Sequence, residues 1–183
     1  MGSSDAGLII DRYTFATERL LARPWHAAEE RGGSDDLAAA VAGMLTEPVT
    51  RWLPPQWGGP YSRARALEWI AQRDAEGPVL LVEDQASGQP LGLVLLFEEA
   101  GAEGTEVRLG YLLAEDAWGR GLGRELLGGV VAWCRARGDV RSIVGGVAMD
   151  NTVSTRLLEL HGFVREPGTN PGGDLSYRLD LAD

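Results

Sequence analysis

The sequence predicts an α/β domain of the α+β kind, with one mixed sheet flanked by helices. Segments in which apolar and polar residues alternate, as in strands, are interspersed with segments whose apolar residues recur every three or four positions, as in helices. One apolar strand leads through a glycine-rich turn directly into a helix. The chain has 183 residues, of which 44% are hydrophobic, and this suits a single domain with a sizeable core.

The strands are predicted from short apolar or alternating runs bounded by turn residues. Residues 8–183 are expected to form the one domain, and residues 1–7, which are small and polar, are expected to be flexible. Pro24 ends one strand because proline cannot donate a ladder hydrogen bond, and Glu98–Gly104 is predicted to be an acidic turn. The expected strands are Leu8–Ile10, Leu20–Arg23, Val79–Glu83, Leu91–Phe97, Thr105–Leu113, Arg141–Val147 and Leu175–Leu181.

The helices are predicted from apolar periodicity together with end signals. Ser34 is a good N-cap residue, and Gly138 and Gly162 stand where two helices are expected to end. Gly128 and Gly129 fall inside a predicted helix, where each costs about 1 kcal/mol relative to alanine, so we expect close packing of that helix on the sheet. The expected helices cover residues 34–45, 62–76, 122–137 and 151–161.

Composition narrows the classes of function. A net charge of −10 argues against nucleic-acid binding and is compatible with a cationic amine substrate. The single Cys134 excludes a disulfide framework, and two isolated histidines give no support for a metal site. No apolar segment reaches the length of a membrane span, and no secretion signal is visible. We therefore expect a soluble, cytoplasmic protein that does not bind membranes.

The segment Asp116–Leu127, which reads DAWGRGLGRELL, carries the strongest chemical signal. Gly119, Gly121 and Gly123 would let backbone N–H groups approach a ligand at a helix N-terminus, where the helix dipole favours an anion. Arginines at positions 120 and 124 add cations to the same rim. This pattern predicts a pyrophosphate cradle. The alternative is that the glycines serve only tight packing.

Three segments resemble the GNAT N-acetyltransferase superfamily. Trp118–Gly123 resembles its acetyl-coenzyme A loop, with Trp118 where the superfamily pattern has Gln or Arg, and its WGRG form resembles the RimJ/RimL-like branch. Thr17–Pro24 resembles the opening strand of that branch. Asn151–Phe163 resembles its C-terminal coenzyme A motif, Asn-x-x-Ser-x-Arg ending in Gly-Phe.

The resemblance implies a mixed, mostly antiparallel sheet in which a splayed central strand pair holds acetyl-CoA. It implies an N-acetyltransferase that acts on a primary amine, either a protein N-terminus or a small amine, by direct attack in a ternary complex. Dimers are common in this branch, so a homodimer is possible. The N–H of Leu112 or Leu113 would face the thioester oxygen. The residues expected to bind the cofactor are Leu112, Leu113, Ala114, Trp118, Gly119, Arg120, Gly121, Leu122, Gly123, Arg124, Asn151, Ser154 and Arg156.

Candidates for the general base lie on the strand before this loop and near the C-terminus. Glu106, Arg108 and Gly110 share one face of that strand. Glu106 could accept the amine proton through water while Arg108 keeps it ionised and contacts the substrate. The alternative is an exposed Glu–Arg pair at the end of the sheet. Asp174 is a second candidate base.

The general acid is where the sequence departs from the superfamily. Many members place a tyrosine four residues before the glycine of the Gly-Phe pair, and Leu158 stands there in this chain. In the RimL-like branch a serine on this helix is thought to serve, and it corresponds to Ser154. Asn151 and Ser154 would share a helical face pointing at the sulfur and the pantetheine arm. The alternatives are a plain N-cap for Asn151 and a hydroxyl bonded back to the helix for Ser154.

The loop of residues 50–60 carries Trp52 and Trp57 between prolines and glycines. Aromatic residues in such a loop suggest a wall of the acceptor site, and burial against the core is the alternative. Two further hypotheses remain open. The absence of the usual tyrosine is compatible with a coenzyme A-binding module without turnover, and glycines that serve only packing would leave a structural domain.

Overall fold

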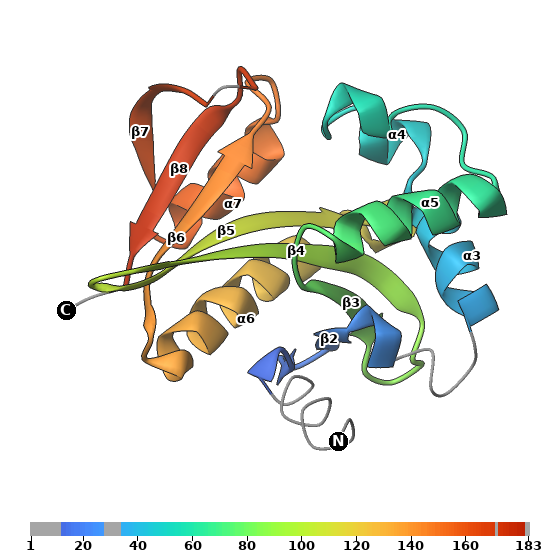
Figure 1. Cartoon of the computed structure of the whole chain (residues 1–183), viewed down its shortest axis with the longest axis horizontal. Helices are drawn as coiled ribbons and strands as arrows, with labels where there is room; N and C mark the ends of the chain where they lie inside the picture. Colours follow the sequence, from blue (N-terminus) through green and yellow to red (C-terminus); the bar gives the residue numbers. More distant parts are fainter. Residues whose placement is uncertain (1–11, 28–33, 171, 182–183) are drawn as a thin grey trace.

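The computed structural model describes residues 12–27, 34–170 and 172–181, and its centre is a single eight-stranded sheet (Figure 1). The strand order is β1-β2-β3-β4-β5-β6-β8-β7. Every neighbouring pair is antiparallel except β5 and β6, which are parallel. The predicted fold class, a mixed and mostly antiparallel sheet flanked by helices, is confirmed. The strands are β1 (Phe15–Ala16), β2 (Leu20–Pro24), β3 (Val79–Asp84), β4 (Pro90–Gly101), β5 (Gly104–Leu113), β6 (Val140–Val147), β7 (Val164–Thr169) and β8 (Leu175–Asp180).

Helices cover both faces of the sheet. The helices α6 and α7 pack on one face, where the larger apolar cluster includes Leu126, Val130 and Leu158. The helices α3 and α5 pack on the other face, where Val41 and Trp69 belong to the second cluster. Among the described residues, no helix is long and apolar enough to cross a membrane. The helical elements are α3 (Ser34–Met44), α4 (Glu47–Thr50), α5 (Arg63–Asp74), α6 (Leu122–Arg137), α7 (Thr152–Leu160) and the 3-10 turns η1 (Pro55–Trp57) and η2 (Glu115–Ala117).

The predicted elements agree with the structure to within a few residues, apart from residues 98–101 and from the unpredicted short elements β1 and α4 and the strand β7. Residues 98–101, predicted to be part of an acidic turn, continue strand β4, and the hairpin turns between Gly101 and Gly104. Ion pairs from Arg137 and Arg12 hold Glu98 in this extension, which periodicity could not show. The edge strand β7 was not predicted because it is polar, mostly exposed and interrupted by proline and glycine. The predicted strand Leu8–Ile10 lies outside the described residues.

The feature that creates the site is the separation of β5 from β6. These parallel strands pair from Thr105 to Leu109 on β5 and from Val140 to Gly145 on β6. Beyond that point β5 continues along β4 to Leu113, while β6 continues along β8 to Val147. The splayed strand pair expected from the resemblance is therefore present. It leaves one backbone edge of β5 without a strand partner.

The glycines inside α6 allow the close packing that the sequence predicted. A Cβ on Gly129 would lie 2.6 Å from Cγ2 of Thr17 and 2.9 Å from Cε2 of Phe15, so the helix touches the turn and strand at β1. A Cβ on Gly128 would lie 3.3 Å from Nε2 of His161, at the end of α7. Both glycines therefore lower the helix propensity of α6 but allow it to pack closely against neighbouring elements.

We predict opposite effects for two Gly→Ala substitutions in helices. Gly129→Ala should lower the free energy of unfolding by about 1–2 kcal/mol, because the new methyl group overpacks against Thr17 and Phe15. Gly43→Ala in α3 is the matched control, since a Cβ there meets nothing within 4 Å, and it should stabilise by about 0.5 kcal/mol. Chemical denaturation of both variants measures the difference. Equal stability of Gly129→Ala and the unmodified chain would contradict the packing explanation.

Candidate functional site

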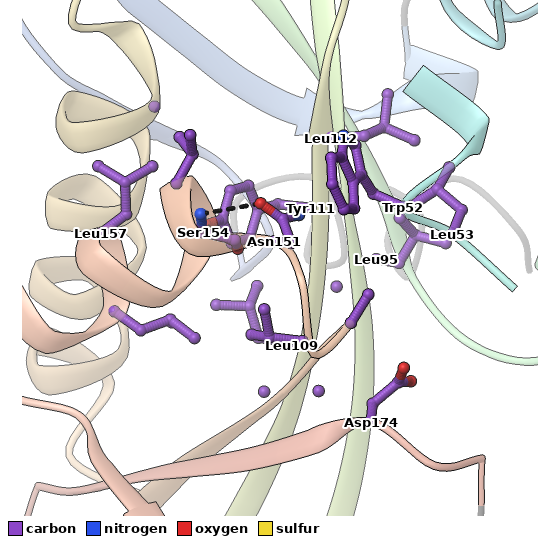
Figure 2. A pocket seen from close by; sticks show the side chains of 18 of the residues that line it. Trp52, Leu53, Leu95, Leu109, Tyr111, Leu112, Asn151, Ser154, Leu157 and Asp174 are labelled. Carbon is purple, nitrogen blue, oxygen red and sulfur yellow. Dashed lines mark hydrogen bonds between the residues drawn. The ribbon is translucent and has the colours of Figure 1, made fainter. Parts of the chain in front are cut away.

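A cavity of about 1360 Å³ lies where β5 and β6 separate. Its walls come from the loop after α4, strands β4, β5, β6 and β8, the glycine loop and the start of α7. Figure 2 shows Ser154, Asn151 and Leu157 on one side, Trp52 and Leu53 on the other, and Tyr111 between them. The volume exceeds that of a typical pocket for one drug-sized ligand, so the cavity has room for two reactants.

Two glycines of the loop shape the backbone and the third serves packing. Gly119 has a φ of 71° and Gly121 has a φ of 78°, values that side-chain-bearing residues rarely adopt. A Cβ on Gly123 would lie 3.1 Å from Cδ1 of Leu157, which brings α6 close to α7. The backbone conformation of the loop therefore explains Gly119 and Gly121, and close packing explains Gly123.

The N-terminus of α6 opens into the cavity without a side-chain cap. The first backbone hydrogen bond of the helix runs from the N–H of Glu125 to the carbonyl of Gly121, at 3.2 Å. The N–H groups of Leu122, Gly123 and Arg124 come before it and have no acceptor within the helix. Aligned peptide dipoles add positive potential at this end, so the arrangement suits an anionic group.

Arg19 and Glu125 hold the glycine loop in place. Glu125 accepts hydrogen bonds from the Thr17 hydroxyl at 2.6 Å and from the backbone N–H and Nε of Arg19, each at 2.7 Å. Arg19 also donates from Nη1 to the carbonyl of Arg120 at 3.1 Å. Burial raises the pKa of the Glu125 carboxyl, but the hydrogen bonds from Thr17 and Arg19 outweigh burial and hold the pKa below its ordinary value.

The free edge of β5 presents particular backbone groups to the cavity. The N–H of Ala114 donates to the carbonyl of Leu91 at 2.9 Å and so faces β4. Because successive residues of a strand direct their backbone groups to opposite sides, Leu112 also faces β4, whereas Tyr111 and Leu113 face the gap. Of the two N–H groups considered above, that of Leu113 therefore points into the gap.

Trp118 joins the glycine loop to this strand edge. Its indole Nε1 donates to the carbonyl of Leu113 at 2.8 Å, and the side chain, 45% exposed, lines the cavity. The indole therefore donates to a carbonyl oxygen on the side of β5 that faces the gap. The N–H of Leu113 remains directed into the gap.

The start of α7 faces the gap from the opposite side. Asn151 is the N-cap, and its Oδ1 accepts the N–H of Ser154 at 3.1 Å. The Ser154 hydroxyl lies 2.8 Å from the hydroxyl of Tyr111. Leu158, one turn further on, is 1% exposed and belongs to the core. Burial raises the pKa of Tyr111, and the hydrogen bond to Ser154 opposes that rise without cancelling it.

Glu106 and Arg108 lie on the cavity floor, on one face of β5. Oε2 of Glu106 accepts from Nη1 of Arg178 at 2.8 Å and from the Ser142 hydroxyl at 3.4 Å. Nε of Arg108 lies 3.7 Å from Oε1 of Glu106, and the Arg108 side chain is 63% exposed. The hydrogen bond that Arg178 donates to Glu106 raises the pKa of Arg178, so the guanidinium stays charged. Sequence reasoning did not identify Arg178 as the main partner of Glu106.

The two tryptophans of the loop after α4 differ in how firmly they are held. Trp57 packs edge-on against Trp69 with ring centroids 5.2 Å apart, and the guanidinium of Arg73 lies 4.5 Å from its ring centroid. Trp52 contacts the guanidinium of Arg51 at 4.6 Å. Both tryptophans line the cavity. Trp57 therefore both lines the cavity and packs against the core, so both alternatives hold for this residue.

Most of the predicted site residues line one cavity, and three do not. Ala114 is 9% exposed and lies behind the strand edge, and Arg156 is exposed on α7 away from the cavity. Arg120 is exposed and contributes its carbonyl to Arg19 rather than lining the cavity. Those that do line it are Trp52, Trp57, Glu106, Arg108, Leu112, Leu113, Trp118, Gly119, Gly121, Leu122, Gly123, Arg124, Asn151 and Ser154, together with Asp174.

Residues 19–164 match the family model of the acetyltransferase (GNAT) domain. The chain belongs to the GNAT acetyltransferase family. Membership implies acetyl-CoA-dependent transfer of an acetyl group, and the chain is an N-acetyltransferase of this family. A comparison with curated proteins gives no match. Among the described residues, no group of three or more His, Cys, Asp or Glu side chains is placed to hold a metal ion.

Solved structures of GNAT proteins share the fold. A GNAT acetyltransferase from Bacillus anthracis is 16% identical, with a TM-score of 0.73 over 93% of this chain and 99% of that one. A protein from Vibrio cholerae described as a candidate ribosomal-protein-serine acetyltransferase is 19% identical, with a TM-score of 0.68 over 92% and 97% of the two chains. An acetyltransferase from Salmonella typhimurium, solved with acetyl-CoA, is 21% identical, with a TM-score of 0.58 over 90% and 95%.

The residues of this GNAT domain fit acetyl-CoA by their chemistry. Gly119 and Gly121 keep the loop free of side chains beside the exposed N–H groups of α6, which suits a pyrophosphate. The unpaired edge of β5 offers backbone groups that suit the amide-containing pantetheine arm.

We predict that Glu125→Gln changes the pH dependence of stability. The pKa of Glu125 is lower in the folded than in the unfolded chain, so its contribution is complete above about pH 4.3 and is lost as the pH falls through the folded value. The variant should be less stable than the unmodified chain at pH 7, and the difference should shrink below about pH 4. Urea denaturation at a series of pH values measures it. Glu68→Gln, at an exposed position on α5, is the control, and a difference that stays constant down to pH 3 would refute the assignment.

Proposed function

We propose that this protein transfers the acetyl group of acetyl-CoA to a primary amine by direct attack in a ternary complex. The observation that carries the proposal is the unpaired edge of β5, which lies beside the uncapped N-terminus of α6 in one cavity. The first feature suits the amides of a pantetheine arm and the second suits a pyrophosphate. No simpler ligand needs both.

The glycine loop and the strand edge would hold the coenzyme. The N–H groups of residues 122–124 and the guanidinium of Arg124 would bind the pyrophosphate, and Leu113 would direct its N–H at the thioester oxygen. Acetyl-CoA, when bound, supplies an activated acyl carbon and a thiol leaving group. A fixed backbone donor at the developing oxyanion lowers the barrier by about 3–4 kcal/mol in comparable sites.

Glu106 is proposed as the base that takes the amine proton, through a water molecule. It lines the cavity, and its carboxylate accepts a hydrogen bond from Nη1 of Arg178 at 2.8 Å. Arg108 is the more exposed of the two neighbouring arginines and would contact the acceptor. Asp174, which also lines the cavity, is the alternative base.

Ser154 and Asn151 are proposed to act on the leaving group. Asn151 fixes the first turn of α7 by capping it, and this places the Ser154 hydroxyl at the gap. Ser154 would give a proton to the departing sulfur, since the position of the usual tyrosine is filled by the buried Leu158.

The acceptor would enter along the wall formed by Trp52 and Trp57. The acceptor is a peptide N-terminus or a small amine, and the wall alone does not separate these classes. The WGRG form of the loop, together with the structural neighbour from Vibrio cholerae, supports the RimJ/RimL-like branch. A cytoplasmic location remains a prediction from the sequence, and a homodimer remains a prediction from that resemblance.

Titration calorimetry with acetyl-CoA tests the cofactor site. The unmodified chain should bind with micromolar affinity, and Gly121→Glu should weaken binding at least about 100-fold, because it adds a side chain and a negative charge beside the pyrophosphate. Gly88→Glu is the matched control. Gly88 has a φ of 71°, lies in the β3–β4 turn away from the cavity, and so carries similar backbone strain. Absence of binding to the unmodified chain would refute the proposed function.

Release of coenzyme A is then measured with two panels of acceptors, peptides with free N-termini and small amines. Release with one panel identifies the acceptor class. Binding of acetyl-CoA without release from any acceptor would instead indicate a coenzyme A-binding module without turnover, the second hypothesis from the sequence.

We predict that Glu106→Gln lowers kcat/KM about 100-fold or more, because a general base commonly contributes that much. Asp174→Asn should change it only a few-fold. The affinity for acetyl-CoA and the melting temperature of each variant are measured in parallel, since Glu106→Gln also weakens the pair with Arg178. The reverse order of effects would assign the base to Asp174.

A further inference from the structure

We propose that Tyr111 is the proton donor behind Ser154, so that the two hydroxyls act as a relay to the sulfur of the leaving coenzyme A. The inference rests on the proposed function and adds Tyr111, a residue that the sequence did not single out. Its basis is a contact between β5 and α7 at the separated strands (Figure 2).

The position of the two hydroxyls is defined by both elements. Tyr111 lies on the part of β5 that has lost its β6 partner, and Ser154 lies on the first turn of α7. Their oxygens are 2.8 Å apart, a normal distance for an O–H···O hydrogen bond, and both residues line the cavity. Ser154 therefore bonds across the gap to another element.

Either hydroxyl can donate in this hydrogen bond, and the relay uses the direction in which Tyr111 donates. A serine hydroxyl donates one hydrogen bond and accepts up to two, so accepting from Tyr111 leaves its own proton free for the cavity. A phenol is far more acidic than an aliphatic alcohol, which makes tyrosine the natural source of the proton and serine the carrier. Leu158 fills the helix position that would otherwise carry a tyrosine, and its side chain is buried in the core. The phenolic hydroxyl is thus provided by the neighbouring strand.

The surroundings keep Tyr111 protonated. Burial is the largest influence on its pKa and raises it, while the hydrogen bond with Ser154 lowers it by less. Tyr111 is therefore neutral at physiological pH and available as a donor.

The proposed step balances as follows. Ser154 gives its hydroxyl proton to the sulfur while the amine nitrogen bonds to the acyl carbon and the carbon–sulfur bond breaks, its electron pair remaining on sulfur. Tyr111 replaces the proton on Ser154. The proton given up by the attacking amine passes through Glu106 and solvent and restores Tyr111. No oxidant, reductant or further reactant is required.

Tyr111→Phe, Ser154→Ala and the double variant test the relay, with Tyr177→Phe as control. Tyr177 is 2% exposed, lies outside the cavity, and its hydroxyl is 3.5 Å from Oε1 of Glu159. Each single variant of the pair should lower kcat about 100-fold with the Kd for acetyl-CoA nearly unchanged, and the double variant should cost no more than Ser154→Ala alone. Tyr177→Phe should keep the unmodified kcat.

A second readout needs no turnover. The ultraviolet absorbance of the thiolate reports the pH at which the thiol of bound coenzyme A ionises. Because hydroxyl donors stabilise a thiolate, Ser154→Ala should raise that pH by about one unit, and Tyr111→Phe should shift it in the same direction.

The outcomes separate the relay from the proposed function. Tyr111→Phe with the kcat and the thiol titration of the unmodified chain would overturn the relay, as would costs that multiply in the double variant. If the unmodified chain binds acetyl-CoA but acetylates no amine, the proposed function fails. The thiol titration would still decide whether Tyr111 and Ser154 act together on the sulfur.

Discussion

Backbone pairing between β5 and β6 ends at Leu109 and Gly145, and each strand then stays with its other neighbour. A strand edge inside a protein leaves backbone N–H and C=O groups without a strand partner. The gap therefore offers a ligand both space and hydrogen-bonding groups. Gly92 helps to hold β4 tightly along this part of β5. A Cβ there would lie 2.3 Å from the carbonyl oxygen of Leu112. The remaining parts of the site are arranged around this gap.

Two helix starts converge on the gap and contribute different chemistry. Helix α6 begins without a side-chain cap and directs N–H groups that lack a helix acceptor toward the gap. Helix α7 begins with Asn151 as its side-chain cap and directs the hydroxyl of Ser154 toward the gap. An uncapped terminus favours an external anion, and a capped terminus has its own backbone donor satisfied. The Arg19–Glu125 pair adds rigidity, because it binds the turn before β2 to both the glycine loop and the first turn of α6.

Local patterns predicted the parts of the site that depend on neighbouring residues. The glycine loop before α6 and the Asn151 cap arise within a few residues of chain, and the sequence indicated both. Patterns could not predict the partners that arrive from far away. Tyr111 meets Ser154 across 43 residues and Arg178 meets Glu106 across 72. Tyr111 packs against the core cluster and also lines the cavity, because β5 and β6 separate at this point.

Periodicity, caps and motifs lie in consecutive residues, so the fold class, most of the helices and strands, the glycine loop and the GNAT family could be predicted from local patterns. Contacts between distant segments establish which residues share the cavity, which backbone groups of β5 face it, and which charges are paired. The tertiary structure placed Arg156 and Arg120 outside the cavity lining and brought Tyr111 to Ser154. The physical reason is that strand register and strand separation determine which side chains become neighbours. Both depend on the packing of segments far apart in the sequence, and a local pattern does not encode that packing.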